Sequence, residues 1–195
     1  MCFPNYAAAT SKSKIAVMIR LFTAVAIPAE IGEHLLPRQH GIDGARWRPR
    51  EAFHITLKFL GDVQETVAAD LDEDLQGIAA PAFDLELAGV GHFGEGPEIH
   101  AVWAGVAESR DLRQLAKAHE DAARRAGLKP ETRLYTPHVT LAYLKRPPVP
   151  EVAAWIQANN LLRSPPFCVD RFGLYSSWRT SEGSAYRLEA EYPLG

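Results

Sequence analysis

The chain has 195 residues, with 21 Lys and Arg residues against 24 Asp and Glu residues and a formal net charge of −3. A hydrophobic fraction of 47% with 23% charged residues is ordinary for a globular protein, and it excludes a disordered chain, a collagen-like repeat and a coiled coil. The slightly acidic total also argues against a protein that coats nucleic acid by bulk positive charge, so a polyanion would have to bind at a local site.

The two cysteines, Cys2 and Cys168, lie near opposite ends of the chain, which favours free thiols in a reducing compartment over a disulfide framework. No apolar run approaches the ~20 residues that a membrane span requires. Residues 1–18 lack the order of a secretory signal, and we expect them to form a loose extension before a single domain over 19–195. The predicted location is the cytoplasm, with no membrane contact.

The first half of the chain predicts two strands, each followed by a helix. The β-rich run over 19–27 is the first strand, and Pro28 then opens a short helix that Pro37 ends. Residues 54–61 are typical of a second strand, and the apolar spacing over 64–79 predicts an amphipathic helix. The acidic face of this helix is interpreted as a solvated surface.

The second half contains the clearest helix, which Ser109 caps and Gly127 ends. A further helix is expected around 152–158, and further strands at 83–90, 99–106, 138–144, 167–175 and 185–192. Helices thus interleave with paired strands, and neither a GxGxxG motif nor a P-loop is present. The sequence therefore predicts an α+β fold rather than a doubly wound nucleotide-binding fold.

An internal repeat is the most informative feature of the sequence. HITLKFLG at 54–61 and HVTLAYLK at 138–145 align without gaps, and they are identical at four of eight positions. Each copy lies in a predicted strand that follows a loop and precedes a helix-forming segment. We infer two related lobes, each of which contributes one strand to a shared groove.

Side chains at i and i+2 of a strand point to the same face, so each copy predicts one polar and one apolar row. The polar rows are His54, Thr56 and Lys58 in the first copy, and His138, Thr140 and Ala142 in the second. The apolar rows, expected to be core, are Ile55, Leu57 and Phe59, and Val139, Leu141 and Tyr143. A single strand histidine is usually structural, but two His-x-Thr copies in matched contexts favour a functional cleft.

Two imidazoles with ordinary pKa values near 6.5 can act as a paired general base and general acid near neutral pH. Two threonine hydroxyls, with Lys58 beside them, can donate hydrogen bonds to the non-bridging oxygens of a phosphate. No Ser/His/Asp elbow accompanies the motifs, and neither cysteine lies near a motif histidine. This combination favours metal-free attack at a phosphodiester.

With their flanks, the two motifs resemble the 2H phosphoesterase superfamily, and more closely the bacterial RNA 2′,3′-cyclic phosphodiesterases, formerly called 2′-5′ RNA ligases. The resemblance is carried by RLF at 20–22, RWRPREAFHITLKFLG at 46–61, TPHVTLAYL at 136–144 and the terminal YPLG. It implies a bilobal α+β fold in which two pseudo-symmetric lobes of antiparallel strands, with helices packed outside, enclose a central cleft.

The resemblance also implies an activity, which is hydrolysis of a terminal 2′,3′-cyclic phosphate on RNA to a 2′-phosphomonoester, without a cofactor or metal. His138 would be the proton acceptor that activates water, and His54 the proton donor to the departing 3′-oxygen. Thr56 and Thr140 would hold the phosphate. The implied partners are RNA ends or nucleotides with a 2′,3′-cyclic phosphate; the chain is expected to be a monomer, and ligation is possible in reverse.

One position departs from the family pattern. Close relatives often have arginine five residues after the second motif histidine, and Tyr143 stands there in this chain. Lys58, Lys145 and Arg146 are candidates for the missing positive charge.

Four residues near the motifs have weaker functional interpretations. Trp47 and Tyr135 precede the two motifs and are candidates for stacking on a base, with ordinary packing as the alternative. His92 and His100 are expected to be structural or exposed rather than metal ligands, because no carboxylate–histidine pattern accompanies them.

Two other functions fit the same residues. A non-catalytic module that binds RNA ends would retain the cleft, although pure binding does not require both an acid and a base. A phosphodiesterase for small cyclic nucleotides would use the same chemistry on a shorter substrate.

The charges are polarised along the chain. Residues 62–108 hold eleven acidic residues and no Lys or Arg, whereas 38–58 and 110–146 carry +3 (5 − 2) and +5 (9 − 4). Both histidine motifs lie in the basic windows, which predicts a phosphate-binding cleft on an acidic body, formed where these windows converge.

Overall fold

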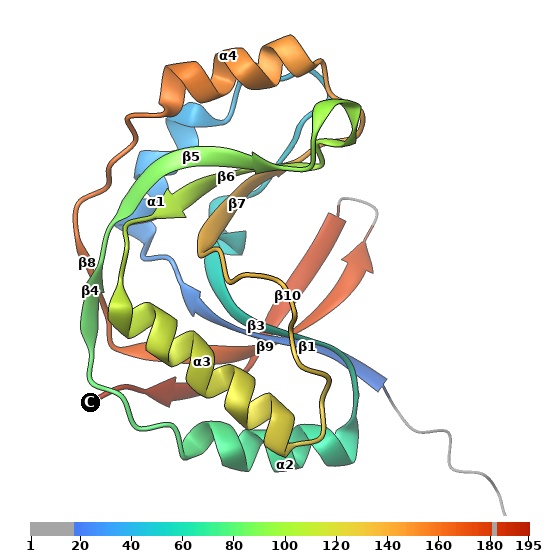
Figure 1. The fold of residues 1–195 in the computed structure, drawn as a ribbon, viewed down its shortest axis with the longest axis vertical. Helices are drawn as coiled ribbons and strands as arrows, with labels where there is room; N and C mark the ends of the chain where they lie inside the picture. The colour runs from blue at the N-terminus through green and yellow to red at the C-terminus, as the bar shows by residue number, and fades with distance from the viewer. Residues whose placement is uncertain (1–17, 181–182) are drawn as a thin grey trace, which may run out of the picture.

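A computed structural model describes residues 18–180 and 183–195. Residues 1–17 of the predicted extension lie outside the described residues, and Met18 is the first residue of β1. The main sheet has eight strands in the antiparallel order β10-β9-β1-β3-β7-β6-β5, with β2 paired to β7. It curves strongly, so that its two halves partly enclose a concave side (Figure 1).

One half of the sheet is built from β1 (Met18–Ala26), β3 (His54–Gln64), β9 (Arg171–Thr180) and β10 (Gly183–Pro193). The other half is built from β2 (Arg46–Trp47), β5 (Leu87–Phe93), β6 (Ala101–Val106) and β7 (His138–Tyr143). The halves join where β3 pairs with β7 at Ile55 and Val139. A separate two-stranded sheet pairs β4 (Phe83–Leu85) with β8 (Phe167–Val169).

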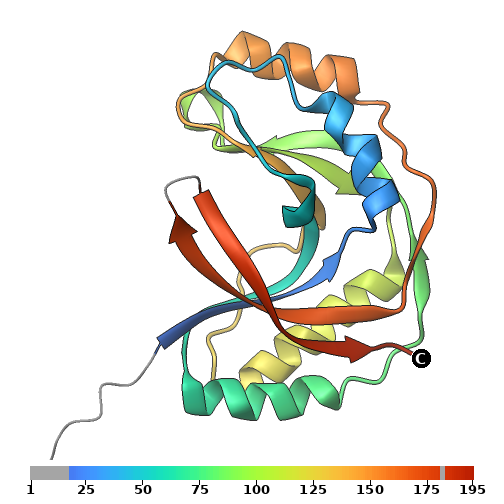
Figure 2. The ribbon, with the colours of Figure 1, turned by 180° about the vertical axis from the view of Figure 1, so that it is seen from behind.

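In the described part of the chain, four α-helices cover the sheet, namely α1 (Ala29–Leu35), α2 (Glu65–Gln76), α3 (Arg110–Arg125) and α4 (Val149–Asn159). Helices α2 and α3 pack together at one end of the molecule, and α4 lies at the other end beside β5 (Figure 1). Seen from behind, α1 covers the upper half of the sheet (Figure 2). Short 3₁₀ turns occupy Leu36–Arg38, Arg50–Ala52 and Gly96–Glu98. This α+β arrangement confirms the predicted fold class.

The boundaries of α3 follow the chemistry that its sequence predicts. The Ser109 Oγ accepts a hydrogen bond of 3.2 Å from the backbone N–H of Leu112. Gly127, at φ +79°, lies just beyond the last turn in the left-handed region that favours glycine. The apolar face of the helix is buried against the sheet, with Leu112 at 0% and Leu115 at 1% exposure.

Two strands are shorter than expected. The run over 83–90 divides into β4 and β5, and the run over 167–175 divides into β8 and β9. The reason is a change of partner, because β4 and β8 pair with each other whereas β5 and β9 belong to the main sheet. The β5 ladder is also irregular between Leu87 and Val90, where Gly89 adopts φ +69°.

Both motif strands contain a β-bulge at the same place. On the ladder with β1, pairing passes from Thr56 directly to Lys58 and skips Leu57. On the ladder with β6, pairing skips Leu141 in the same way. A bulge inserts one residue and ends the simple alternation of faces. The predicted polar and apolar rows are therefore correct up to the bulge and wrong after it.

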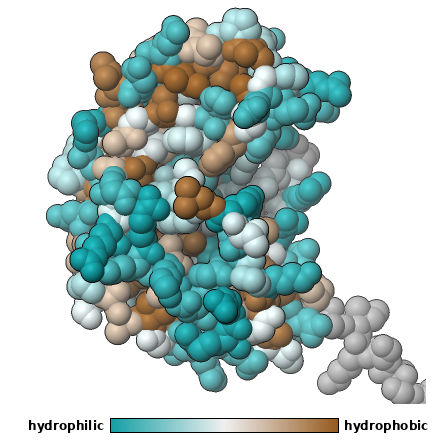
Figure 3. All heavy atoms as spheres, viewed as in Figure 1, coloured by the Kyte–Doolittle hydropathy of each residue, from teal (hydrophilic) through white to brown (hydrophobic). Residues whose placement is uncertain are grey.

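The surface seen in the view of Figure 1 is mostly polar, with apolar side chains gathered near the top, where α4 lies (Figure 3). In the described part of the chain, none of the helices is long and apolar enough to cross a membrane.

Candidate active site

The two His-x-Thr motifs lie side by side at the centre of the main sheet. β3 and β7 run antiparallel, and the second residue of one motif pairs with the second residue of the other. His54 therefore stands opposite Thr140. In the same way, His138 stands opposite Thr56. The two histidines occupy diagonal positions related by an approximate two-fold axis through the strand pair.

All four side chains line one cavity of about 450 Å³, here called the central cavity. Its cationic side chains are Arg20, Arg133 and Arg179, and no Asp or Glu of the described residues lines it. Its aromatic walls are formed by Phe22, Phe59, Phe93, Tyr143, Trp178 and Tyr186. A cavity with three arginines and no carboxylate favours an anionic ligand.

The two histidine rings are held in the same way. The Nδ1 of His54 donates to the Ala52 carbonyl oxygen at 2.9 Å, and the Nδ1 of His138 donates to the Thr136 carbonyl oxygen at 2.7 Å. A carbonyl oxygen only accepts, so Nδ1 carries the proton in each ring. The Nε2 atom of each neutral ring is therefore left with a lone pair that can accept a proton.

Aromatic neighbours desolvate both histidines. The His54 ring lies 5.0 Å from Phe22 and 5.1 Å from Tyr186, centroid to centroid. Burial lowers the pKa of His54 to about 4, and the nearby charges of Arg48 and His138 also lower it. The His138 ring lies 4.7 Å from Phe93, and burial lowers its pKa as well. Both imidazoles are accordingly neutral at pH 7 in the free protein.

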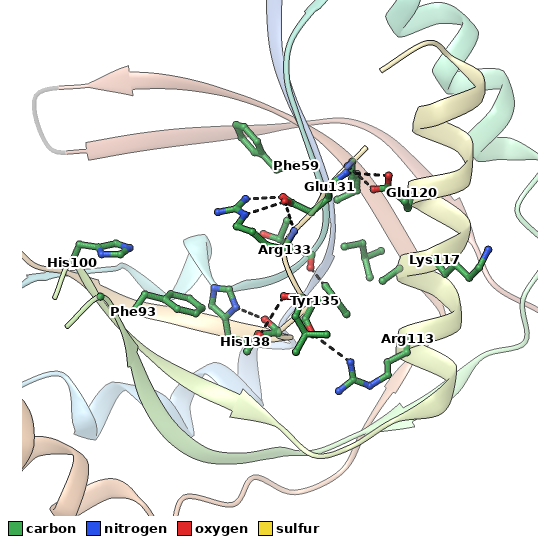
Figure 4. Close-up of a pocket in the computed structure, with 17 residues that line it drawn as sticks. Phe59, Phe93, His100, Arg113, Lys117, Glu120, Glu131, Arg133, Tyr135 and His138 are labelled. Carbon is green, nitrogen blue, oxygen red and sulfur yellow. Dashed lines mark hydrogen bonds and ion pairs between the residues drawn. The ribbon is translucent and has the colours of Figure 1, made fainter. Parts of the chain in front are cut away.

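A larger cavity of about 700 Å³ adjoins the central cavity between β3, α3 and the loop before β7 (Figure 4). The two cavities share Thr56, Phe59, Phe93, His100, Arg133 and His138. Charged side chains around the larger cavity pair with one another, as Lys58 does with Glu120 at 2.5 Å and Arg133 with Glu131 at 2.7 Å. Its remaining lining is mostly apolar, including Leu57, Ala116 and Leu134.

The predicted role of Lys58 as a phosphate ligand is not favoured by its position. The bulge at Leu57 turns Lys58 toward α3, where its side chain is 6% exposed and paired with Glu120. Phe59, expected in the core, is instead 45% exposed and lines both cavities. Tyr143 likewise faces the central cavity rather than the core. These three differences have one cause, which is the bulge in each motif.

The other proposed cations lie elsewhere. Lys145 and Arg146 are exposed and line neither cavity. The guanidinium of Arg48 lies beside Tyr143, with 5.6 Å between its central carbon and the tyrosine ring centroid. No local motif in the sequence marks Arg48, because its neighbours in space come from distant segments.

The two stacking candidates have different surroundings. Trp47 packs against Trp155 of α4, with 6.2 Å between ring centroids, and lines neither cavity. This position does not favour a stacking role for Trp47. Tyr135 lines the larger cavity, and its hydroxyl donates to the Thr56 carbonyl oxygen at 3.1 Å. Burial raises the pKa of Tyr135, so its hydroxyl stays protonated.

His92 and His100 also differ from each other. His92 donates from Nδ1 to the Gly94 carbonyl oxygen at 3.0 Å and lines neither cavity. His100 is exposed, stacks beside Phe93 and lines both cavities. Within the described residues, no three His, Cys, Asp or Glu side chains are grouped as metal ligands would be.

The basic windows of the sequence do meet at the motif strands, but most of their cations are neutralised. Lys58, Arg113 and Arg125 each pair with a carboxylate. Of the arginines that line the central cavity, Arg133 comes from the second window and pairs with Glu131, whereas Arg20 of β1 and Arg179 of β9 lie outside the windows. The charge pattern along the chain therefore predicts the motif strands and Arg133, but not Arg20 and Arg179.

The sequence of this chain is similar to those of known proteins. The 2′-5′ RNA ligase superfamily profile matches residues 29–180. An Archaeoglobus fulgidus protein named RNA 2′,3′-cyclic phosphodiesterase is 30% identical over 172 residues, covering 87% of this chain and 97% of that protein. An Aeropyrum pernix protein of the same name is 41% identical over 96 residues, covering 49% of this chain; the chain spans about half (54%) of its length.

A solved structure shares the fold. The crystal structure of Escherichia coli LigT complexed with 3′-AMP superposes with a TM-score of 0.74 at 27% identity, covering 91% of this chain and 98% of that one.

Proposed function

The chain belongs to the 2′-5′ RNA ligase superfamily, and we propose that it hydrolyses a terminal 2′,3′-cyclic phosphate on RNA to a 2′-phosphomonoester. The observation that carries this proposal is the matched pair of histidines, each with its Nδ1 proton held by a carbonyl, beside a cavity with three arginines. Paired imidazoles suit proton transfer at a phosphate, and the arginines suit its negative charge.

The proposed reaction moves one proton at each histidine. The Nε2 of His138 takes a proton from water as the water oxygen bonds to phosphorus. The bond from phosphorus to the 3′-oxygen then breaks, and the Nε2–H of His54 protonates the departing oxygen. Hydroxyl groups of Thr56 and Thr140 donate hydrogen bonds to the non-bridging oxygens.

The donor role of His54 requires it to gain a proton first. Its pKa of about 4 in the free protein leaves the ring neutral at pH 7. A bound phosphate anion favours the imidazolium, because an opposite charge within a few ångströms stabilises the charged form. We therefore expect the substrate to bind together with a proton.

Single substitutions test the proposal. His54→Ala and His138→Ala are each expected to lower kcat on a 2′,3′-cyclic-phosphate oligonucleotide by at least about 10²-fold, the usual contribution of one general acid or base. His92→Ala is the matched control, because His92 is held by the same type of Nδ1 hydrogen bond but lines neither cavity. Near-normal turnover in either motif variant contradicts the proposed roles.

The product and the substrate range separate the remaining alternatives. A 2′-phosphate product identifies the 3′-oxygen as the leaving group, whereas a 3′-phosphate reverses that assignment. Tight binding of the RNA end without conversion between pH 5 and 9 would instead indicate a binding module. Faster turnover of a mononucleotide 2′,3′-cyclic phosphate than of the oligonucleotide would indicate a small-nucleotide phosphodiesterase. Loss of activity in chelator would indicate a metal-dependent hydrolase.

A further inference from the structure

Arg48 is a buried cation behind the tyrosine side chains that line the central cavity. Arg48 is 7% exposed. Its backbone N–H donates a hydrogen bond of 2.8 Å to the carbonyl oxygen of Leu141, which is the bulged residue of β7. No described carboxylate lies within ion-pairing distance of its guanidinium. A buried charge without a carboxylate is costly, so other groups must stabilise it.

Two tyrosines and one carbonyl provide that stabilisation. The guanidinium carbon lies 5.6 Å from the ring centroid of Tyr143 and 5.3 Å from that of Tyr186. Both distances are in the range of cation–π attraction. The Nη2 of Arg48 also donates to the Ser184 carbonyl oxygen at 3.0 Å. The side chain thus ties β7 to β10, on opposite halves of the sheet, through the tyrosines that line the central cavity.

Arg48 is linked to His54 through one of these tyrosines. The Tyr186 ring meets the His54 ring at 88° with 5.1 Å between centroids. Burial raises the pKa of Tyr186 to about 12, so its hydroxyl remains protonated and neutral at pH 7. The positive charge of Arg48 also lies close enough to disfavour the imidazolium of His54. An anion in the central cavity would relieve that repulsion.

We propose that Arg48 is a positioning residue, which fixes the tyrosine wall beside His54 and supplies a buried positive charge that favours a phosphate group in the central cavity. This inference rests on the proposed function, because it names a determinant of phosphate recognition at the same site. Arg48 acts through Tyr143 and Tyr186 and through its electric field, and it does not itself line the cavity.

The charged and titratable groups around His54 define what the test must separate. The groups on the neighbouring elements and around the cavity are Arg48, His138, His100, Tyr143, Tyr186, Arg20, Arg133 and Arg179. Only a change that follows the charge at residue 48, with the other groups present, supports the proposal.

The test compares Arg48→Met, which keeps an unbranched chain between the tyrosines but removes the charge, with Arg48→Lys, which keeps the charge. Arg46→Met is the matched control, because Arg46 is exposed two residues earlier and lines neither cavity. Calorimetry at pH 7 measures the Kd of adenosine 2′-monophosphate. We expect about tenfold weaker binding in Arg48→Met, a smaller loss in Arg48→Lys and no change in Arg46→Met.

An NMR titration of His54, compared between Arg48→Met and Arg48→Lys, gives a second readout that follows the charge at residue 48. Its pKa should rise in Arg48→Met and stay near the wild-type value in Arg48→Lys. Three results would overturn the proposal. The first is unchanged binding in Arg48→Met, and the second is no binding by the wild type. The third is equal loss of binding in Arg48→Met and Arg48→Lys while the pKa of His54 stays the same. Because neither measurement needs turnover, a wild type that binds the monophosphate without hydrolysing the cyclic phosphate disproves only the proposed function.

Discussion

His119 on α3 makes the stability of this protein depend on pH independently of the candidate active site. Its side chain is 0% exposed, its Nδ1 donates to the Leu115 carbonyl oxygen at 2.8 Å, and its ring packs 4.4 Å from that of Phe172. Its Nε2 is buried without a hydrogen-bond partner. Burial lowers its pKa from 6.5 to about 4, so the folded chain holds this imidazole neutral.

The sign and size of the effect follow from linkage. Below pH 6.5 the unfolded chain binds a proton at this histidine that the folded chain does not bind until about pH 4. The contribution of the neutral His119 to the free energy of unfolding is therefore complete above pH 6.5, and it is lost as the pH falls toward 4. With these two pKa values, the loss between pH 7.5 and pH 5 is about 2 kcal/mol from this residue alone.

His119→Leu removes the titrating group and keeps a buried apolar side chain against Phe172. Urea denaturation at pH 7.5 and pH 5 gives the free energy of unfolding of each protein. We expect the wild type to lose about 2 kcal/mol more than the variant on acidification, whatever the difference between them at pH 7.5. Equal losses in the two proteins would refute the assignment of a buried neutral imidazole at this position.

Two further predictions concern the active site and a buried ion pair. Burial lowers the pKa of both His54 and His138 below 6.5, and the proposed reaction requires one of them to be protonated and the other neutral. We therefore expect kcat/KM to be maximal below pH 6.5 and to fall as the pH rises. A pH–rate profile with its maximum above pH 7 would contradict this prediction. Glu120→Gln leaves the buried Lys58 ammonium without its partner and should lower the free energy of unfolding, measured by urea denaturation, by about 3 kcal/mol. Asp121→Asn breaks the exposed pair with Lys117 and should leave the free energy of unfolding nearly unchanged.

The position of the two motif histidines in one cavity could be predicted because the motif is encoded locally and twice. Each His-x-Thr motif places its two polar side chains on one face by the alternation of a strand, and the alternation holds over those three residues. The repeat also predicts that each copy contributes one strand to a shared groove, and the pairing of Ile55 with Val139 places the two motifs side by side along one cavity. The α3 helix was equally predictable, since its cap, apolar face and terminal glycine lie within one segment.

The rest of the site could not be predicted from the alternation of side chains along a strand or from local secondary-structure propensity. The bulges arise from pairing with neighbouring strands, so they leave no distinct signal in the eight-residue motifs. The ion pair of Lys58 with Glu120 joins residues 62 positions apart, and Arg48 meets Tyr186 from the other half of the sheet. Strand alternation therefore predicts the wrong face for the side chains after each bulge, and no local motif marks Arg20, Arg48 and Arg179.

The repeated bulge explains why each motif carries an aromatic residue at its sixth position. If Leu57 and Leu141 were paired regularly, Phe59 and Tyr143 would turn toward the core, and the cavity would lose one aromatic side chain from each half. With the bulges, each motif presents one histidine, one threonine and one aromatic ring to the same cavity. Neither half alone has both a proton acceptor and a proton donor, so the chemistry requires the junction of β3 with β7. The single strand pair at this junction is thus the part of the fold on which the proposed reaction depends most directly.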